Sequence, residues 1–240
     1  MSDWRKRVAV VAMALFVIFA GLSFIVICFI VRLCIVIRSG SKCKPGEKGP
    51  ICVLVVAGSG GHTTEILRLM ESLSLSYSPR HYVIADTDKM SEDKIRTFER
   101  SKKNTGSEGQ SVHAVYLTIC LPQFTLQRIP RSREVRQSWS SSVVSTLNAL
   151  LYAVPLVFRL SPDMVLCNGP GTCVPLCAAG LLLGLVGLKK VLIVYVESIC
   201  RVESLSLSGK ILYRLSDYFF VQWSSLKDKY PKSIYLGRIV

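Results

Sequence analysis

The stretch ICVLVVAGSGGHTTE, residues 51–65, decides the fold. Its first half, residues 51–57, is an uninterrupted apolar run, which is typical of a parallel strand covered on both faces. The next four residues, 58–61, include three glycines, which let the backbone turn sharply and approach a ligand closely. Thr63 or Thr64 is expected to cap the helix that follows. Because free amides at a helix start favour an anion, this turn is a candidate phosphate-binding loop, with an ordinary tight turn as the alternative.

The composition favours an anionic partner. The chain has 240 residues, half of them hydrophobic, and a formal net charge of +14 at pH 7. Such a charge suits nucleic acid, a phospholipid surface or a phosphorylated substrate. The basic residues are spread along the chain without interleaved aromatic residues or a nucleic-acid motif, so we exclude nucleic acid as a partner. The length allows one α/β domain of ordinary size and an appendage.

The nine cysteines are scattered and odd in number, and several, such as Cys28 and Cys177, lie in apolar runs. This pattern is typical of buried reduced thiols in a protein that faces the cytosol, and not of a disulfide framework. Cys167 and Cys173 have no paired CxxC or histidine partners, so no metal site is expected. The sequence indicates no cofactor either.

Residues 8–31 form a continuous apolar segment. At about 1.5 Å per residue it is long enough to cross a hydrocarbon core of about 30 Å, and we expect a single transmembrane helix. More basic residues follow the segment than precede it, which favours a cytosolic C-terminal body. We therefore expect an N-terminal tail (1–7), a membrane helix (8–31), a basic linker (32–50) and one cytosolic domain (51–240).

Strand-like and helix-like segments alternate along that domain, without signals of an antiparallel hairpin. This order predicts an α/β fold with a Rossmann-like, doubly wound parallel sheet. The predicted strands are residues 51–57, 81–85, 114–121, 164–167, 191–196 and 218–221. The predicted helices are residues 64–75, 91–100, 137–158, 174–188 and 208–215.

Ligands of such a sheet bind at the carboxyl ends of its strands. A second glycine-rich loop, Asn168-Gly169-Pro170-Gly171-Thr172, follows a predicted strand, and Glu197-Ser198 follows another. Two glycine loops at one edge can each offer amides to one half of a diphosphate. Arg128, Arg131 and Arg133 are candidates for its counter-charge. The alternative for these arginines is a solvated or membrane-facing loop.

His62 and Glu197 are the candidate catalytic residues. His62 can act as a general base toward a sugar hydroxyl, or it can donate to backbone or phosphate and orient its loop. Glu197 can bind a sugar hydroxyl, act as a base, or cap the turn that follows it. As a second function we considered a membrane-bound nicotinamide-dependent oxidoreductase. The dinucleotide fingerprint is only partial, because Thr63 stands where its third glycine is required.

Five motifs together carry a family resemblance: VVAGSGGHTTE (55–65), YSPRHYVIADTD (77–88), IPRSREV (129–135), CNGPGTCVP (167–175) and YVESICRVE (195–203). They resemble the membrane-anchor subunit of the eukaryotic dolichol-linked UDP-N-acetylglucosamine transferase, over residues 49–240. A more distant likeness is to the acceptor half of the bacterial peptidoglycan-lipid GlcNAc transferase. The segment 113–126 is longer and more apolar than the family pattern, either as a lineage insertion or as a mis-spliced segment, which leaves the third strand's register open.

The resemblance implies one half of a two-domain GT-B glycosyltransferase, on the acceptor side. The complete enzyme would add the second GlcNAc to GlcNAc-diphosphate-dolichol at the cytosolic face of the endoplasmic reticulum, in lipid-linked oligosaccharide synthesis for protein N-glycosylation. A separate soluble subunit would bind UDP-GlcNAc, so this single-pass chain is expected to be inactive alone. Other enzymes of the same lipid-linked pathway are further candidate partners.

The length supports the same division, since only about 190 residues follow the predicted anchor, enough for one such sheet. The apolar tail 234–240 is expected to dock the partner through Leu236, Ile239 and Val240, or else to pack on its own core. The residues expected to bind the acceptor diphosphate are Gly58, Ser59, Gly60, Gly61, Thr63, Asn168, Gly169, Gly171, Thr172, Arg131 and Arg133.

Overall fold

The computed structural model describes residues 2–38, 49–74, 76–106, 124–134 and 137–240. The chain divides into two compact units, Met1–Gly40 and Ser41–Val240, which we describe separately.

The first unit is one long helix, α1 (Ser2–Arg38). Its stretch Arg7–Val36 is long and apolar enough to cross a membrane. The most apolar 18 residues of this stretch have a mean hydropathy of 3.0, and none of them is buried in protein. The predicted membrane segment 8–31 lies within α1. The helix continues past it to Arg38, so the first part of the predicted linker is helical. The rest of that linker, 39–48, lies outside the described residues.

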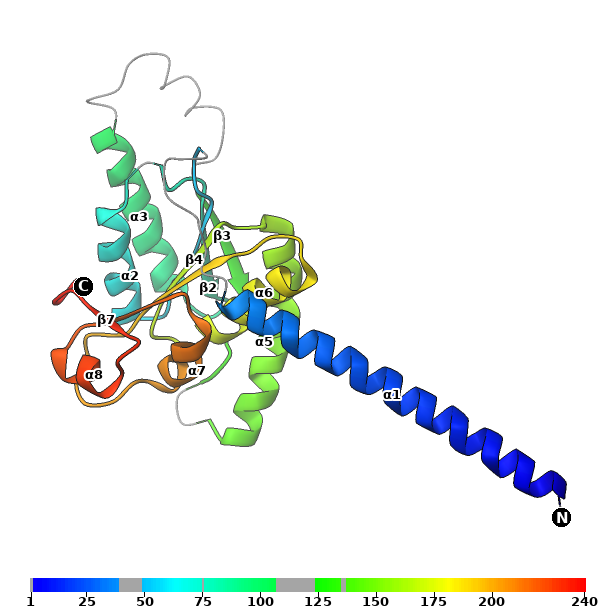
Figure 1. The fold of residues 1–240 in the computed structure, drawn as a ribbon. Coiled ribbons are helices and arrows are strands. Elements are labelled where there is room, and N and C mark those ends of the chain that lie inside the picture. Colours follow the sequence, from blue (N-terminus) through cyan, green and yellow to red (C-terminus); the bar gives the residue numbers. More distant parts are fainter. Residues whose placement is uncertain (1, 39–48, 75, 107–123, 135–136) are drawn as a thin grey trace. The chain divides into compact units, whose positions relative to one another are not determined.

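The second unit is built on a seven-stranded sheet in the order β3-β2-β1-β4-β5-β6-β7, and every strand pairing in it is parallel (Figure 1). The doubly wound prediction is therefore confirmed. The chain runs outward from β1 to β3 and then returns to place β4 beside β1. The strands are β1 (Val53–Val56), β2 (Arg80–Ala85), β3 (Phe124–Ile129), β4 (Met164–Asn168), β5 (Leu192–Val196), β6 (Tyr218–Val221) and β7 (Ile234–Tyr235).

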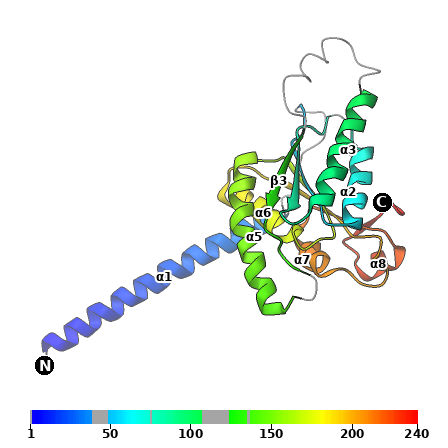
Figure 2. The same ribbon diagram turned by 180° about the vertical axis from the view of Figure 1, so that it is seen from behind.

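Helices cover both faces of the sheet. Figures 1 and 2 show α2 (Gly61–Ser72) and α3 (Lys89–Gly106) on one side, with α5 (Trp139–Leu160) and α6 (Cys173–Val186) on the other. α7 (Leu207–Leu215) joins the α6 side, and the short α8 (Ser224–Lys229) follows β6. The alternation of β1 side chains explains the uninterrupted apolar run. Leu54 and Val56 enter the core under α6, whereas Val53, Val55 and Ala57 enter the core under α2.

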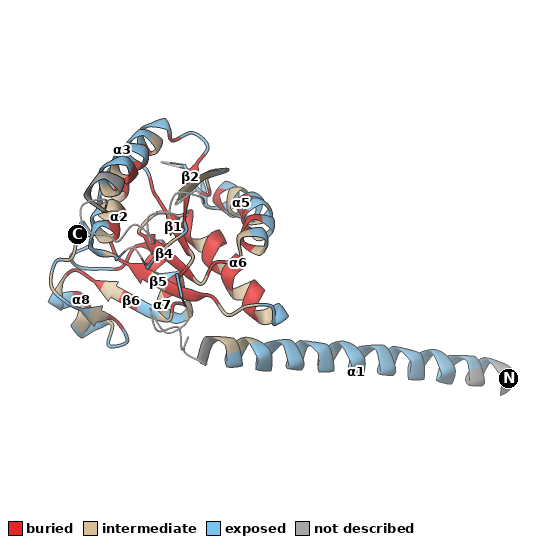
Figure 3. Cartoon of the chain, turned by 90° about the horizontal axis from the view of Figure 1, so that it is seen from above, coloured by how far each residue is buried: buried red, intermediate tan, exposed pale blue. Residues whose placement is uncertain are grey.

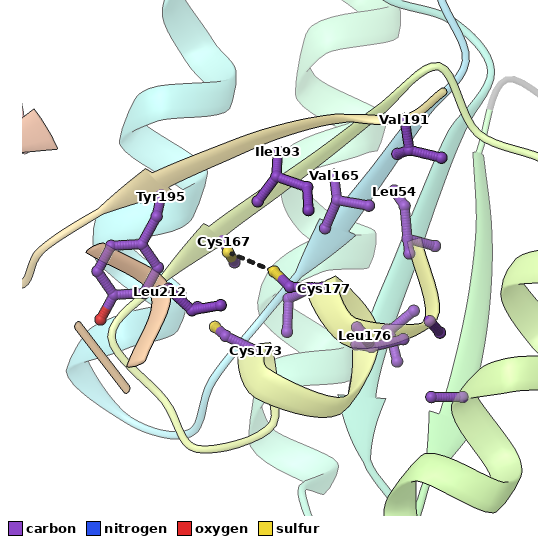
Figure 4. Close-up of a cluster of buried hydrophobic side chains, with 14 of the residues drawn as sticks. Leu54, Val165, Cys167, Cys173, Leu176, Cys177, Val191, Ile193, Tyr195 and Leu212 are labelled. Atoms are coloured by element: carbon purple, nitrogen blue, oxygen red, sulfur yellow. Dashed lines mark hydrogen bonds between the residues drawn. The ribbon is translucent and has the colours of Figure 1, made fainter. Parts of the chain in front are cut away.

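A group of free thiols fills part of the α6-side core (Figure 4). Cys167 on β4 and Cys177 on α6 point toward each other, with their Sγ atoms 3.6 Å apart. Burial raises the pKa of Cys167 and of the neighbouring Cys173, so both stay protonated. Every cysteine of the described residues is free. Cys167, Cys173 and Cys177 are buried, whereas Cys28, Cys34 and Cys200 are exposed.

The third strand of the described sheet is β3, at residues 124–129, and the predicted strand 114–121 lies outside the described residues. β3 is the last strand of the described sheet on its side and pairs only with β2, from Arg80↔Phe124 to Ala85↔Ile129. Pro130 follows it directly and has no amide hydrogen for further pairing. Most of its side chains are only half-buried, which explains why its sequence lacks a strong apolar pattern.

Two helix ends also differ from the predictions. α2 begins at Gly61 with Gly60 as its N-cap, and no side chain caps it, so neither Thr63 nor Thr64 has the expected role. α3 (Lys89–Gly106) continues past residue 100, where the predicted helix ends. Its Lys102 donates to the carbonyl oxygens of Met70 and Leu73 at the end of α2, at 2.5 and 2.8 Å. This contact gives the polar end of α3 a partner that the sequence pattern does not reveal.

Candidate functional site

The two glycine loops meet at one point of the sheet. β1 and β4 are neighbours, with Val56 opposite Cys167, so the loops that follow them leave the same edge side by side. They are in contact: a Cβ added to Gly58 would lie 2.6 Å from Cγ of Pro170. The order of the strands reverses between β1 and β4, and this reversal is where doubly wound sheets bind their ligands.

His62 joins the two loops. It lies in the first turn of α2, and its Nδ1 is 3.2 Å from Oδ1 of Asn168 at the end of β4. The other end of that amide is also used, because Nδ2 of Asn168 donates to the Val196 carbonyl oxygen at 3.4 Å. The amide oxygen therefore faces the imidazole and Nδ1 carries the proton. In the neutral ring this leaves Nε2 as the lone-pair nitrogen.

Glu65 is a site residue that the sequence analysis did not single out. It lies one helical turn after His62, with Oε2 3.8 Å from the imidazole Nδ1, and its Oε1 accepts from the Ser198 hydroxyl at 2.9 Å. The Glu65 carboxylate raises the pKa of His62. Burial acts to raise the pKa of Glu65, but hydrogen bonding by His62, Asn168 and Ser198 outweighs it and lowers that pKa. The i, i+3 spacing of His62 and Glu65 was the available signal.

Glycine is required at two loop positions for different reasons. Gly169 has φ +70°, and a Cβ there would lie 2.5 Å from Cε1 of His62, so the imidazole packs directly on this backbone. Gly60 has φ +67° with open space around it. Ser59, Gly60 and Gly61 are exposed. The start of α2 thus offers backbone amides without a capping side chain, which is the arrangement that attracts an anion.

Thr63 supports the first loop from beneath. It is fully buried, and its hydroxyl donates to the Gly58 carbonyl oxygen and lies 2.6 Å from Oγ of Ser91. Ser91 in turn donates to the Asp88 carboxylate at 2.6 Å. The Thr63 hydroxyl therefore holds the loop and does not face a ligand. Thr172 lies at the start of α6 and is also buried.

The arginines divide into two groups. The Arg133 guanidinium lies 4.8 Å from the centre of the Trp139 ring, and Cβ of Arg133 would lie 3.7 Å from a Cβ on Gly171. Arg133 thus borders the second glycine loop, and Arg131 is half-buried two residues earlier. Arg128 instead forms an ion pair with Glu92 on α3 and donates to the Asp86 carbonyl oxygen. The ion pair with Glu92 already balances its charge, which disfavours the expected role of Arg128 as counter-charge for a diphosphate.

Glu197 is buried beneath the site. Its Oε2 accepts from the Ser206 amide at 3.0 Å and the Ser206 hydroxyl at 3.1 Å, while Oε1 accepts from the Ser198 amide at 3.2 Å. Ser206 is the N-cap of α7. Burial raises the pKa of Glu197. Since the side chain has no exposed surface, the geometry favours the capping alternative over contact with a substrate.

The C-terminal tail packs partly on its own domain. Ile234–Tyr235 forms β7 beside β6, and Ile239 and Val240 pack partly on the α2-side core. The Ile239 amide donates to Oε1 of Gln222 at 2.9 Å. Leu236, however, is 66% exposed. Among the described residues no three histidine, cysteine or acidic side chains are grouped to hold a metal ion.

The fold and the site define a class: a Rossmann-like α/β domain with a pair of glycine-rich loops at its topological switch point, and a preceding helix that can cross a membrane. The profile of the family described as "Oligosaccharide biosynthesis protein Alg14 like" matches residues 53–239. The chain belongs to this family, and the resemblance seen in the five motifs is confirmed.

The chain is also similar to individual proteins whose names match this family. The chain is 56% identical over 224 residues to the human "UDP-N-acetylglucosamine transferase subunit ALG14", covering 93% of this chain and 98% of that protein. It is 63% identical over 188 residues to the protein of that name from Mus musculus, covering 78% and 82%. Among solved structures, MurG of Acinetobacter baumannii is similar with a TM-score of 0.47 and 16% identity, covering 72% of this chain and 41% of that one.

Proposed function

We propose that this chain is the membrane-anchoring, acceptor-side subunit of a UDP-GlcNAc transferase. In this proposal the complete enzyme adds the second GlcNAc to GlcNAc-diphosphate-dolichol at the cytosolic face of the endoplasmic reticulum, for protein N-glycosylation. Family membership and the relatives' names as transferase subunits support the assignment over a nicotinamide-dependent oxidoreductase. The observation that carries it is the His62–Asn168 contact, which brings the two glycine loops together.

The acceptor diphosphate would lie against the amides of residues 58–61 and the backbone of residues 168–172. In this proposal the first turn of α2 offers its amides to the diphosphate, Arg133 borders the second glycine loop, and Arg131, two residues earlier, is a further candidate for the counter-charge. With His62 protonated, the imidazolium beside Glu65 adds a positive charge facing the diphosphate. This binding role requires no metal ion, because backbone amides donate hydrogen bonds to the diphosphate and cationic side chains balance its negative charge.

The transfer step would use His62 in its neutral form. The acceptor hydroxyl oxygen forms a bond to the anomeric carbon of the donor sugar, the bond from that carbon to the UDP oxygen breaks, and UDP leaves. Nε2 of His62 takes the hydroxyl proton, because Nδ1–H is committed to Asn168. The alternative is that His62 only donates to phosphate and orients the loop.

The donor half would come from a soluble partner. Family membership supports a heteromeric enzyme, and the exposed Leu236 beside the packed Ile239 and Val240 is our candidate contact for that partner. Recruitment to the membrane would then follow from α1, whose apolar stretch is long enough to cross it.

The test is His62→Gln in the full chain, co-purified with its soluble partner in mild detergent. Loss of a general base predicts a fall in kcat of about 10²- to 10⁴-fold, with partner recovery unchanged. The matched control is Lys94→Gln, an exposed residue on α3. Unchanged turnover would refute the catalytic role, and a raised KM with unchanged kcat would favour the orienting role. Transfer by the purified single chain would refute its role as a subunit.

A further inference from the structure

One side of α5 exposes a continuous apolar face. Its large side chains recur every three or four residues and are each more than half exposed, although the helix belongs to the folded domain. Figure 3 shows the side of α5 that is turned away from α6 as exposed. We call this surface the α5 face, and it consists of Trp139, Val143, Val144, Leu147, Leu151 and Tyr152.

The opposite side of α5 is packed. Ala149, Ala153, Leu156 and Val157 enter the core beside α6. α5 is long and apolar enough to pass as a membrane span by composition, but a helix with one side in a protein core cannot be surrounded by lipid. Contiguous exposed apolar patches of this kind mark interaction sites in soluble proteins. We therefore expect a broad apolar surface to contact the α5 face.

The membrane-spanning capacity of α1 and the short connection to the domain indicate that this apolar surface is a lipid bilayer. α1 can cross a membrane, and residues 39–48 connect it to the domain. Ten residues span at most about 35 Å, so a membrane-inserted α1 keeps the domain within that distance of the lipid surface. The α5 face also has the composition of an interfacial helix. Trp139 and Tyr152 flank branched aliphatic side chains, and these two residue types are enriched where bilayers meet water.

The charges around the α5 face fit anionic lipid headgroups. α5 contains no acidic residue, and its one charged side chain is Arg159 in the last turn. The preceding residues, 130–138, include three arginines and one glutamate. One of these, Arg133, lies over the Trp139 ring at 4.8 Å, which pairs an interfacial aromatic residue with a cation at headgroup depth. Basic residues bordering an apolar helix face strengthen binding to anionic membranes.

We infer that the α5 face lies in the interfacial layer of the membrane, as a second attachment besides α1. Arg133 contacts the α5 face at Trp139 and the second glycine loop near Gly171. The switch-point site therefore opens next to the lipid surface. An amphiphilic anion can keep its hydrocarbon chain in the bilayer while its charged group reaches the loops. The membrane attachment itself does not depend on the proposed transferase function.

Tryptophan fluorescence of the full chain tests this inference. The variant Trp4→Phe/Trp223→Phe keeps only Trp139, and the matched variant Trp4→Phe/Trp139→Phe keeps only Trp223, which lies outside the α5 face. Each is reconstituted in vesicles of phosphatidylcholine with phosphatidylserine, with or without lipids brominated on the acyl chain. We expect the bromolipids to quench at least half of the Trp139 emission and to leave Trp223 unquenched.

Two outcomes would overturn the inference. Quenching of Trp139 by aqueous acrylamide but not by bromolipid would show that the α5 face lies in water. Quenching by neither agent would show that protein, a partner or a second copy, covers it. The single variant Trp4→Phe keeps both indoles and the bond from Trp223 to the Ile199 carbonyl oxygen. In this variant bromolipid must quench part of the emission, which controls for damage caused by replacing Trp223.

Discussion

The His62 imidazole and the Asn168 amide are 106 positions apart in the chain and 3.2 Å apart in space. Because Asn168 also donates to the Val196 carbonyl oxygen, the amide has one orientation and the imidazole one neutral tautomer. Asn168→Ala removes the acceptor from Nδ1, so we expect a mixture of tautomers and a loss of transfer activity of about 10- to 100-fold. Nitrogen chemical shifts of the His62 ring report the tautomer directly.

The control for this prediction is Asn148→Ala, an exposed asparagine on α5. An Asn168→Ala protein that keeps the Nδ1–H tautomer and full activity would contradict the positioning role.

Glu65→Gln should lower the pKa of His62, because it removes the carboxylate that raises it. Activity that requires neutral His62 increases as pH rises through this pKa. The acidic limb of the pH–rate profile should therefore move to lower pH in the variant. Stability has the opposite pH dependence: the raised pKa of His62 stabilises the wild-type fold below the unfolded pKa, about 6.5, and this gain is lost as pH rises through the folded pKa.

Titration of the histidine ring signals by NMR measures the Glu65→Gln shift, with the exposed Glu71→Gln of the same helix as control. An unchanged His62 titration in Glu65→Gln would show that the two side chains are not coupled.

Gly169→Ala should destabilise the fold and displace His62. The backbone has φ +70°, and the added methyl group would lie 2.5 Å from the ring. A residue with a Cβ in this conformation costs about 1–3 kcal/mol before the clash is relieved. Denaturant unfolding measures the loss. For stability alone Gly61→Ala is the comparison, since nothing lies within 4 Å of its added Cβ, and equal losses in the two variants would refute the argument.

Glu197→Ala should loosen the start of α7, because it leaves the buried Ser206 amide without its acceptor. An unsatisfied buried donor costs about 1–3 kcal/mol. Glu197→Gln keeps an acceptor oxygen and should lose less. The raised pKa of Glu197 predicts that its contribution to stability falls as pH rises through that value, and the variant should lack this dependence. If Glu197→Gln abolished transfer at unchanged stability, a catalytic role would be supported instead.

Substitutions in the C-terminal tail, residues 234–240, can distinguish partner docking from a contribution to the stability of the fold. Leu236→Asp should weaken partner recovery with little change in the free energy of unfolding, because Leu236 is exposed. Ile239→Asp should lower stability as well, since Ile239 packs on the core. Co-purification and thermal unfolding of both variants check this contrast, which fails if Leu236→Asp leaves recovery intact.

The sequence predicted the sheet because most of its strands are buried on both faces and appear as unbroken apolar runs. The exception, β3, has a neighbour on one side only within the described sheet, so Thr125 and Arg128 are tolerated in it and no clear pattern remains. The start of α2 was missed because its N-cap is a bare glycine. The end of α3 was missed because Lys102 of α3 contacts the end of α2, a contact between two helices.

The glycine motifs allowed the position of the candidate site to be predicted. Two glycine loops after two strands had to share an edge once the sheet was parallel. The roles within the site depend on contacts between distant segments. Asn168 can reach His62 because β4 pairs with β1, and buried Glu197 accepts from Ser206, the N-cap of the distant helix α7. Such contacts leave no local signature in composition or spacing.

His62 follows β1 and Asn168 ends β4, the two strands between which the strand order reverses. This placement also constrains how the protein folds. As the chain is synthesised, α1, β1 and the first glycine loop emerge long before β4, and no part of the chain before residue 168 can form the paired site. A slip of β4 by one position against β1 would turn Asn168 to the opposite face. The NMR signal of the His62 ring therefore depends on the pairing of β4 with β1. It reports whether the two halves of the sheet have paired in the native register.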